Sequence, residues 1–146
     1  MHPISLVQIA THRHAFLYRV RPGSPYRSLK RLIENPTVSK IVQGATEETR
    51  ELRRDLGIEA RGFVDLPTVA KAAGFSELNL RALAASALGI RISKAAQRSD
   101  WSRLELTQAQ LEYAATDAWA CLAVHERIVS AAGNGGAGRP PPRRRS

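Results

Sequence analysis

The stretch Leu111-Glu112-Tyr113-Ala114-Ala115-Thr116-Asp117-Ala118-Trp119 determines the fold that we expect for this 146-residue chain. Its composition predicts a helix, on which Tyr113 and Asp117 stand four residues apart and project from neighbouring turns. A carboxylate can bind a divalent metal ion, and a neighbouring phenol can hold the water that the ion activates. The pair therefore indicates one half of a hydrolytic phosphodiester site. On spacing alone, a surface hydrogen-bonding pair is an equally good interpretation.

The helix around this pair is well specified. Thr107 and Gln110 have the spacing of a capping box, so we expect a helix from about Leu106 to Ala132. We expect Tyr113 and Asp117 to lie together, off the apolar stripe that packs into the core. That predicted stripe consists of Leu111, Ala115, Ala118, Leu122 and Val129.

The preceding sequence alternates strand-like and helix-like segments. Short β-prone runs flank a turn at residues 11–14, which favours a hairpin. Ser24 and Pro25 are placed to cap and open the first helix, and the glycine at 57 is placed to end the second. Strands are predicted at residues 4–9, 15–20, 40–43 and 62–66. Helices, in addition to the last one, are predicted at residues 25–35, 46–56, 68–73 and 78–88.

Length and composition predict one domain. The chain is 43% hydrophobic, enough for a core at this length, and we expect the domain to span residues 1–132. Residues 133–146 are rich in Gly, Pro and Arg and predict a disordered tail. A single cysteine, Cys121, excludes an internal disulfide and a cysteine-based zinc cluster, so we expect an intracellular protein, in cytoplasm or nucleus. Neither a signal peptide nor a transmembrane segment is predicted.

Charge is compatible with a nucleic-acid partner. The formal net charge is +9 and the sequence pI is about 10.8, although four arginines of the tail make the remainder only moderately basic. A generic basic surface explains the charge equally well. Gly44 lacks the glycine and lysine companions of a Rossmann or P-loop nucleotide site, so that class of binding has no support.

Eight segments occur in an order that carries a family resemblance. They are Ile4–Ala10, Lys40–Gly44 leading into Glu48–Leu52, Phe63–Leu66, Asn79–Ala84, Arg91–Lys94, Ser99–Trp101, Leu106–Gln110 and Tyr113–Asp117. This order resembles the 3'-5' exonuclease domain of the ribonuclease D and Werner-type family, in the branch whose third motif is Tyr-x-x-x-Asp. The resemblance runs from about Pro3 to Ile128.

The resemblance implies a ribonuclease H-like α/β fold, with a central mixed sheet flanked by helices. It implies hydrolysis of nucleotides from DNA or RNA 3' ends, with carboxylates that hold two Mg²⁺ or Mn²⁺ ions. Tyr113 would position water and Asp117 would bind metal. Glu48 falls where the family has an Asp, so it is a candidate catalytic and metal-binding residue; an acid that favours the first turn of a helix is the alternative interpretation.

The family's first motif, an Asp-x-Glu strand, has no counterpart here, because the first acidic residue is Glu34. We therefore expect a fold shortened by one strand, an unprotected edge on the strand at residues 4–9, an incomplete two-ion site and weak or absent activity. Two explanations remain open: a start upstream of Met1, or a non-catalytic nucleic-acid-binding relative. The oligomeric state and the choice between DNA and RNA also stay open.

Further residues have candidate roles before the last helix. Arg91, Lys94 and Arg98 form a basic segment that could contact phosphates. Trp101 could stack on a base or anchor the core, and the second interpretation is preferred. Asp65 could support the metal site, although capping the helix at Pro67 is the preferred interpretation.

Overall fold

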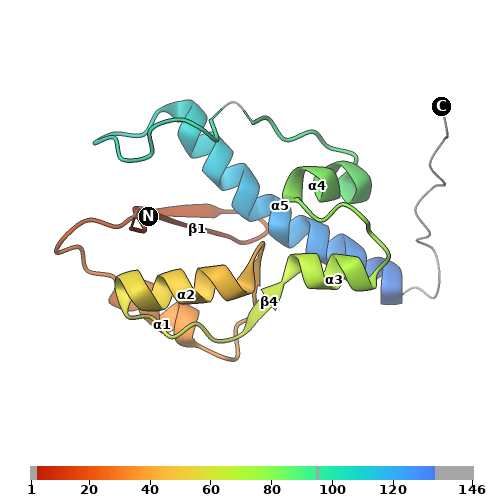
Figure 1. The fold of residues 1–146 in the computed structure, drawn as a ribbon, viewed down its shortest axis with the longest axis horizontal. Helices are drawn as coiled ribbons and strands as arrows, with labels where there is room; N and C mark the ends of the chain where they lie inside the picture. The colour runs from red at the N-terminus through yellow and green to blue at the C-terminus, as the bar shows by residue number, and fades with distance from the viewer. Residues whose placement is uncertain (1–2, 95, 134–146) are drawn as a thin grey trace.

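The computed structural model describes residues 3–94 and 96–133 (Figure 1), and it has α/β architecture. Strands precede and alternate with helices along the chain, as the sequence predicted. The elements are β1 (Leu6–Ala10), β2 (Ala15–Arg19), α1 (Arg27–Glu34), β3 (Lys40–Val42), α2 (Ala45–Leu56), β4 (Phe63–Asp65), α3 (Leu66–Ala72), α4 (Leu80–Leu88) and α5 (Gln108–Gly133).

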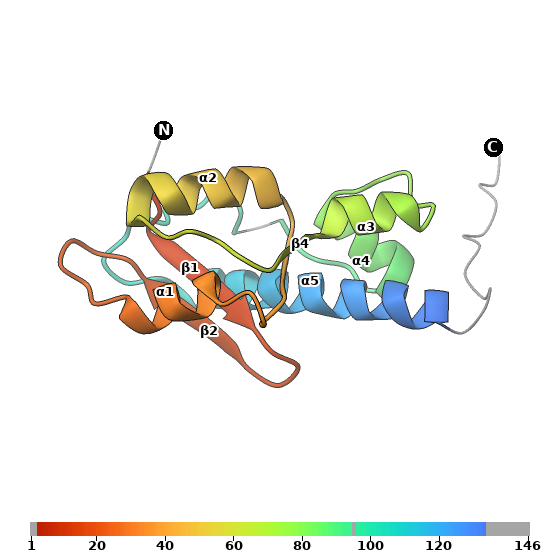
Figure 2. The same ribbon diagram turned by 90° about the horizontal axis from the view of Figure 1, so that it is seen from below.

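The hairpin of β1 and β2 is antiparallel and is covered on both faces. Its register pairs Leu6 with Arg19 and Ala10 with Ala15, and the backbone N–H of Thr11 donates to the carbonyl of His14 at 2.8 Å in the turn. One face packs on a cluster formed by α1 and α2 with Ile58, and α5 contacts the hairpin too. At the tip, His12 contacts Glu126 of α5. The hairpin is thereby sandwiched between helices, as Figure 2 shows from a second direction.

A parallel pair, β3 and β4, carries the start of α2. The helix α2 is the crossover connection between these two strands, so the carboxyl end of β3 leads into α2 at Ala45. Lys40 fixes the entrance of β3, since its ammonium donates to the carbonyls of Leu32 and Asn35 at the end of α1, at 3.0 and 2.7 Å. Gly57, with φ of +63°, ends α2 as the sequence predicted.

A second core lies between α3, α4 and α5. It contains fully buried aliphatic side chains from all three helices, and Ile92 from the segment after α4 joins it. The helix α5 contacts β1, β2, β3, α3 and α4 and so connects the two halves of the molecule. Side chains on α5 therefore face several elements at once.

The strands form two separate sheets among the described residues, where we expected one central mixed sheet. The sheet orders are β1-β2 and β3-β4, so β1 and β3 each have one hydrogen-bonded neighbour. The backbone N–H of Val20 donates to the carbonyl of Ser5. Because hydrogen-bonded pairs alternate along an antiparallel ladder, the backbone N–H and C=O groups of Leu6, Gln8 and Ala10 point away from β2. A pocket of about 480 Å³ lies along Ser39 and Ile41 at β3 and the second half of α5. Within residues 3–94 and 96–133, the outer edge of β1 thus has no strand neighbour, as expected, although α5 contacts this strand.

Two local predictions were wrong. Ser24 does not cap α1, which begins at Arg27 without a side-chain cap; the hydroxyl of Ser24 instead accepts a hydrogen bond from the backbone N–H of Arg21 at 3.2 Å. The predicted stripe of α5 is not its buried face either, and Val129 in that stripe is 51% exposed. Contacts on several sides of α5 shift burial to another set: Gln110, Ala114, Ala120, Cys121, Val124 and Ile128.

The other predicted strands and helices are confirmed, with ends displaced by at most two residues, as is common for element boundaries. The predicted disordered tail begins at Gly133, which is the last residue of α5, and residues 134–146 lie outside the described residues. No described helix combines the length and apolar character needed to cross a membrane.

Candidate active site

Tyr113 and Asp117 contact each other on α5. The phenol hydroxyl donates a hydrogen bond to the Asp117 carboxylate, and both side chains are half-buried. Burial raises the pKa of Asp117, and the hydrogen bond from Tyr113 opposes this rise. Burial, followed by the Asp117 charge, raises the pKa of Tyr113, so the phenol stays protonated near neutral pH. The pair thus presents a carboxylate and a neutral hydroxyl side by side.

Glu48 lies in the first turn of α2 within a group of carboxylates. It is half-buried, and its pKa is raised to about 7 by burial and then by the charges of Glu51, Asp65 and Glu47. A carboxylate that is costly to ionise gains much from a cation beside it. Glu48 therefore has the electrostatic setting of a metal ligand as well as the helix-start position of its alternative interpretation.

The two halves of this site meet near Cys121. This buried thiol lies one turn after Asp117 on α5, and its pKa is raised to about 12 by burial and then by the charges of Glu48 and Asp117. Both charges therefore act on the same side chain, although 69 residues separate Glu48 and Asp117 in the sequence. Cys121 is the core thiol that the sequence analysis predicted, and the charges of two of the selected site residues, Glu48 and Asp117, act on it.

Asp65 has the structural role that was preferred for it. Its carboxylate accepts hydrogen bonds from the backbone N–H and hydroxyl of Thr68, at 3.1 and 2.6 Å, and so caps α3. The other oxygen accepts from the backbone N–H of Ala45 at 2.8 Å. The Thr68 contact is the first cause of the lowered pKa of Asp65. Asp65 thereby fixes the start of α2, and with it Glu48, relative to β4.

The segment before α5 is clamped onto Tyr113. The amide nitrogen of the buried Gln110 donates to the hydroxyl of Ser99 and the carbonyl of Asp100, both at 2.9 Å. Its amide oxygen accepts a hydrogen bond from the backbone N–H of Thr107. In return, the Thr107 hydroxyl accepts one from the backbone N–H of Gln110, which confirms the predicted capping box. Trp101 is half-buried, with its ring centroid 6.0 Å from that of Tyr113. The clamp therefore holds an aromatic neighbour against the catalytic candidate.

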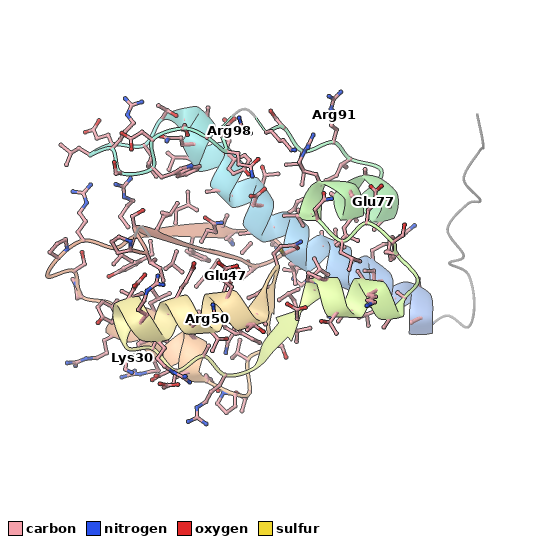
Figure 3. The ribbon with its side chains drawn as sticks, viewed as in Figure 1. Lys30, Glu47, Arg50, Glu77, Arg91 and Arg98 are labelled. Carbon is pink, nitrogen blue, oxygen red and sulfur yellow. The ribbon has the colours of Figure 1, made fainter. Side chains whose placement is uncertain are left out.

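The predicted phosphate-binding residues lie along one exposed segment between α4 and α5. Arg91, Lys94 and Arg98 are all exposed, and Figure 3 shows Arg91 projecting outward near α4 and Arg98 beside the first turns of α5. Sequence reasoning missed Arg81, whose charge acts on Tyr113 and lowers its pKa against the stronger effect of burial. Its place in the Asn79–Ala84 motif gave no sign of this contact, because α4 and α5 meet only in the fold.

A family model described as "3'-5' exonuclease" matches residues 2–131. The chain belongs to the 3'-5' exonuclease family. The homology includes the exonuclease domains of ribonuclease D, WRN and RRP6, as the order of motifs indicated. This membership fixes the family of the chain, whereas the roles of its individual residues remain predictions.

Curated relatives of the family cover most of the chain. The mouse bifunctional 3'-5' exonuclease/ATP-dependent helicase WRN is 29% identical over 86% of the chain, and ribonuclease D of Haemophilus influenzae is 27% identical over 84%. These matches span 9% and 31% of the relatives' own lengths, so the chain corresponds to part of each.

Solved structures in the family share the fold. Escherichia coli RNase D has a TM-score of 0.79 at 22% identity, over 89% of this chain and 35% of that one. Brucella melitensis NrnC has a TM-score of 0.80 at 23% identity, over 91% of this chain and 67% of that one. NrnC has also been solved with bound Mg²⁺ and with pGG.

The donors of this chain fit a divalent cation in part. Glu48 and Asp117 are half-buried carboxylates whose charges both act on Cys121, and their raised pKa values indicate poorly compensated negative charge. Mg²⁺ is often held by one or two carboxylates together with water and substrate phosphates. Among the described residues, no group of three or more His, Cys, Asp or Glu side chains is placed to hold a metal ion. Glu48 and Asp117 are thus the two carboxylates of the described residues that we would assign to a metal ion.

Proposed function

We propose that this chain acts as a metal-dependent 3'-5' exonuclease domain on DNA or RNA. The observation that carries the proposal is the Tyr113–Asp117 pair on α5, together with Glu48 on α2, whose charge, like that of Asp117, acts on Cys121. The family model that matches residues 2–131 supports the proposal. Relatives that act on or bind nucleic acid, such as ribonuclease D and NrnC with pGG, support the same substrate class.

Each residue has a distinct task in this proposal. Asp117 and Glu48 would hold Mg²⁺ or Mn²⁺ ions, which in a two-ion site lower the pKa of the attacking water and stabilise the leaving oxygen. The Tyr113 hydroxyl, held by Asp117, orients the water for attack on the terminal phosphorus. The bond from that phosphorus to the 3' oxygen of the preceding nucleotide breaks, so a 5'-mononucleotide leaves and a new 3' hydroxyl remains.

The test is degradation of 5'-labelled single strands of DNA and RNA in Mn²⁺ with enzyme in excess. Stepwise shortening from the 3' end is expected, even at a low rate, and a 3'-terminal phosphorothioate should slow it. Asp117→Asn should reduce the rate at least about 100-fold, because it removes a ligand charge, and Tyr113→Phe about 10- to 100-fold with unchanged strand affinity. Glu112→Gln, an exposed carboxylate on the same helix, is the matched control.

A second candidate function is nucleic-acid binding without hydrolysis. It is favoured by the small number of converging carboxylates, Glu48 and Asp117, in a chain of net charge +9. Strand binding with no Mn²⁺-dependent shortening would support this candidate and contradict the exonuclease proposal. Shortening that persists unchanged in Asp117→Asn would contradict the assignment of the site.

A further inference from the structure

A pocket bounded by two arginines lies between α4 and the segment that follows it. Its volume is about 310 Å³, and its polar lining comes from Asn79, Arg81 and Arg91 together with Glu77. With two arginines and one glutamate, the lining has a net positive formal charge. The Asn79 side chain accepts from the backbone N–H of Ala82 at 2.9 Å and so fixes the start of α4 at the pocket.

Arg81 is held in place at this pocket. It is half-buried, and its Nε donates to the carbonyl of Ile92 at 3.1 Å, which ties α4 to the segment that carries Arg91. One nitrogen of the guanidinium is thus used within the protein. The ion pairs found among the described residues involve neither Arg81 nor Arg91. Within the described residues, neither charge is therefore offset by a salt bridge.

The charge of Arg81 also acts at the candidate active site. Because α4 packs along α5, this charge reaches the phenol of Tyr113. The pocket lined by Arg81 therefore lies on the α4 side of α5, the helix that carries the Tyr113–Asp117 pair.

We propose that Arg81 and Arg91 bind a backbone phosphate of the nucleic-acid strand, upstream of the 3' end that lies at Tyr113 and Asp117. This proposal rests on the proposed function, and it adds Arg81 to Arg91, which the sequence analysis had already named as a candidate phosphate contact. A guanidinium matches a phosphate in both charge and geometry. The pocket lining contains no aromatic ring on which a base could stack, so the contact reads the backbone and not the sequence.

The experiment measures binding of a labelled single-stranded oligonucleotide in EDTA, at several salt concentrations, by fluorescence anisotropy. Arg81→Gln and Arg91→Gln are compared with Arg31→Gln, which removes an exposed charge from α1. Each pocket variant should bind about 5- to 10-fold more weakly than the control, and the slope of log affinity against log salt should fall by about 0.7 for each phosphate that the variant no longer binds. Arg81→Lys should recover part of the affinity.

A series of oligonucleotides, each with one neutral methylphosphonate, locates the phosphate. At one position, the methylphosphonate should weaken binding to the wild type but should not further weaken binding to Arg81→Gln. Affinities and salt slopes of Arg81→Gln and Arg91→Gln equal to those of Arg31→Gln would overturn the proposal. Arg91→Gln changes an exposed side chain, so its result does not depend on whether Arg81→Gln folds.

Binding in EDTA separates this proposal from the proposed function. A chain that binds through Arg81 and Arg91 but shows no hydrolysis in Mn²⁺ would contradict only the exonuclease activity. A chain that hydrolyses strands but binds them equally well without either arginine would contradict only the phosphate contact.

Discussion

At the scale of single residues, Glu48 makes stability depend on pH. In the folded chain its pKa is about 7, against a usual value of 4.5, so the folded state binds an extra proton between these values. The free energy of unfolding should therefore fall as pH rises from about 4.5 to 7. The stabilising contribution of protonated Glu48 is fully present below pH 4.5 and is lost above 7.

Glu48→Gln should remove this dependence, because an amide does not ionise. In EDTA at pH 8 the variant should be more stable than the wild type by about 1–2 kcal/mol, after allowance for solvent screening of a half-buried group. At pH 4 the two should be similar. Denaturant unfolding checks this, with Glu112→Gln as the control. Equal stabilities of Glu48→Gln and wild type at pH 8 would mean that Glu48 is not buried among acids.

At the scale of elements, Gln110 fixes the start of α5 to the segment that carries Trp101. Gln110→Ala removes the side-chain hydrogen bonds of Gln110 to the Ser99 hydroxyl, the Asp100 carbonyl and the Thr107 backbone N–H. We expect a loss of about 2–3 kcal/mol of unfolding free energy, because three partly buried hydrogen bonds are lost together. Gln108→Ala removes only a surface contact with Glu112 and should change stability by less than about 0.5 kcal/mol. Equal effects in thermal unfolding would contradict the clamp.

Gly62, just before β4, packs closely against the backbone that leads into β3. Its φ is +71°, and a Cβ there would lie 2.7 Å from the carbonyl oxygen of Val38. Gly62→Ala should therefore cost more than about 2 kcal/mol, from strain and collision together. Gly57→Ala, at a φ of +63° with no atom within 4 Å, should cost about 1 kcal/mol. Urea unfolding compares the two, and a smaller loss for Gly62→Ala would show that the contact relaxes.

Sequence reasoning succeeded where the determinants are local. The capping box at Thr107 and Gln110 and the glycine at the end of α2 depend on neighbouring residues, and both are present. It failed where several elements meet. The buried face of α5 is set by its contacts with β1, β3, α3 and α4 together, so a single stripe could not be predicted from periodicity. The proximity of Arg81 to Tyr113 has the same origin.

At the scale of the whole molecule, α5 belongs to one hydrophobic cluster and contacts the hairpin of the other. The hairpin packs with α1 and α2 in one cluster, while α3 and α4 pack on α5 in the other. Glu48 comes from the first half of the chain, and Tyr113 and Asp117 come from the second. The site therefore exists only when both halves are folded together. Family motifs identified its members, and packing supplies their proximity.

The most direct test of this account is Mn²⁺ binding, measured by electron paramagnetic resonance at pH 8, where Glu48 is ionised. The chain is compared with Glu48→Gln, Asp117→Asn and the double variant. If both carboxylates hold the same ion, each single change should weaken binding at least about 10-fold, and the double variant should be little weaker than either. Unchanged binding in either single variant, or losses that multiply in the double variant, would contradict a shared metal site.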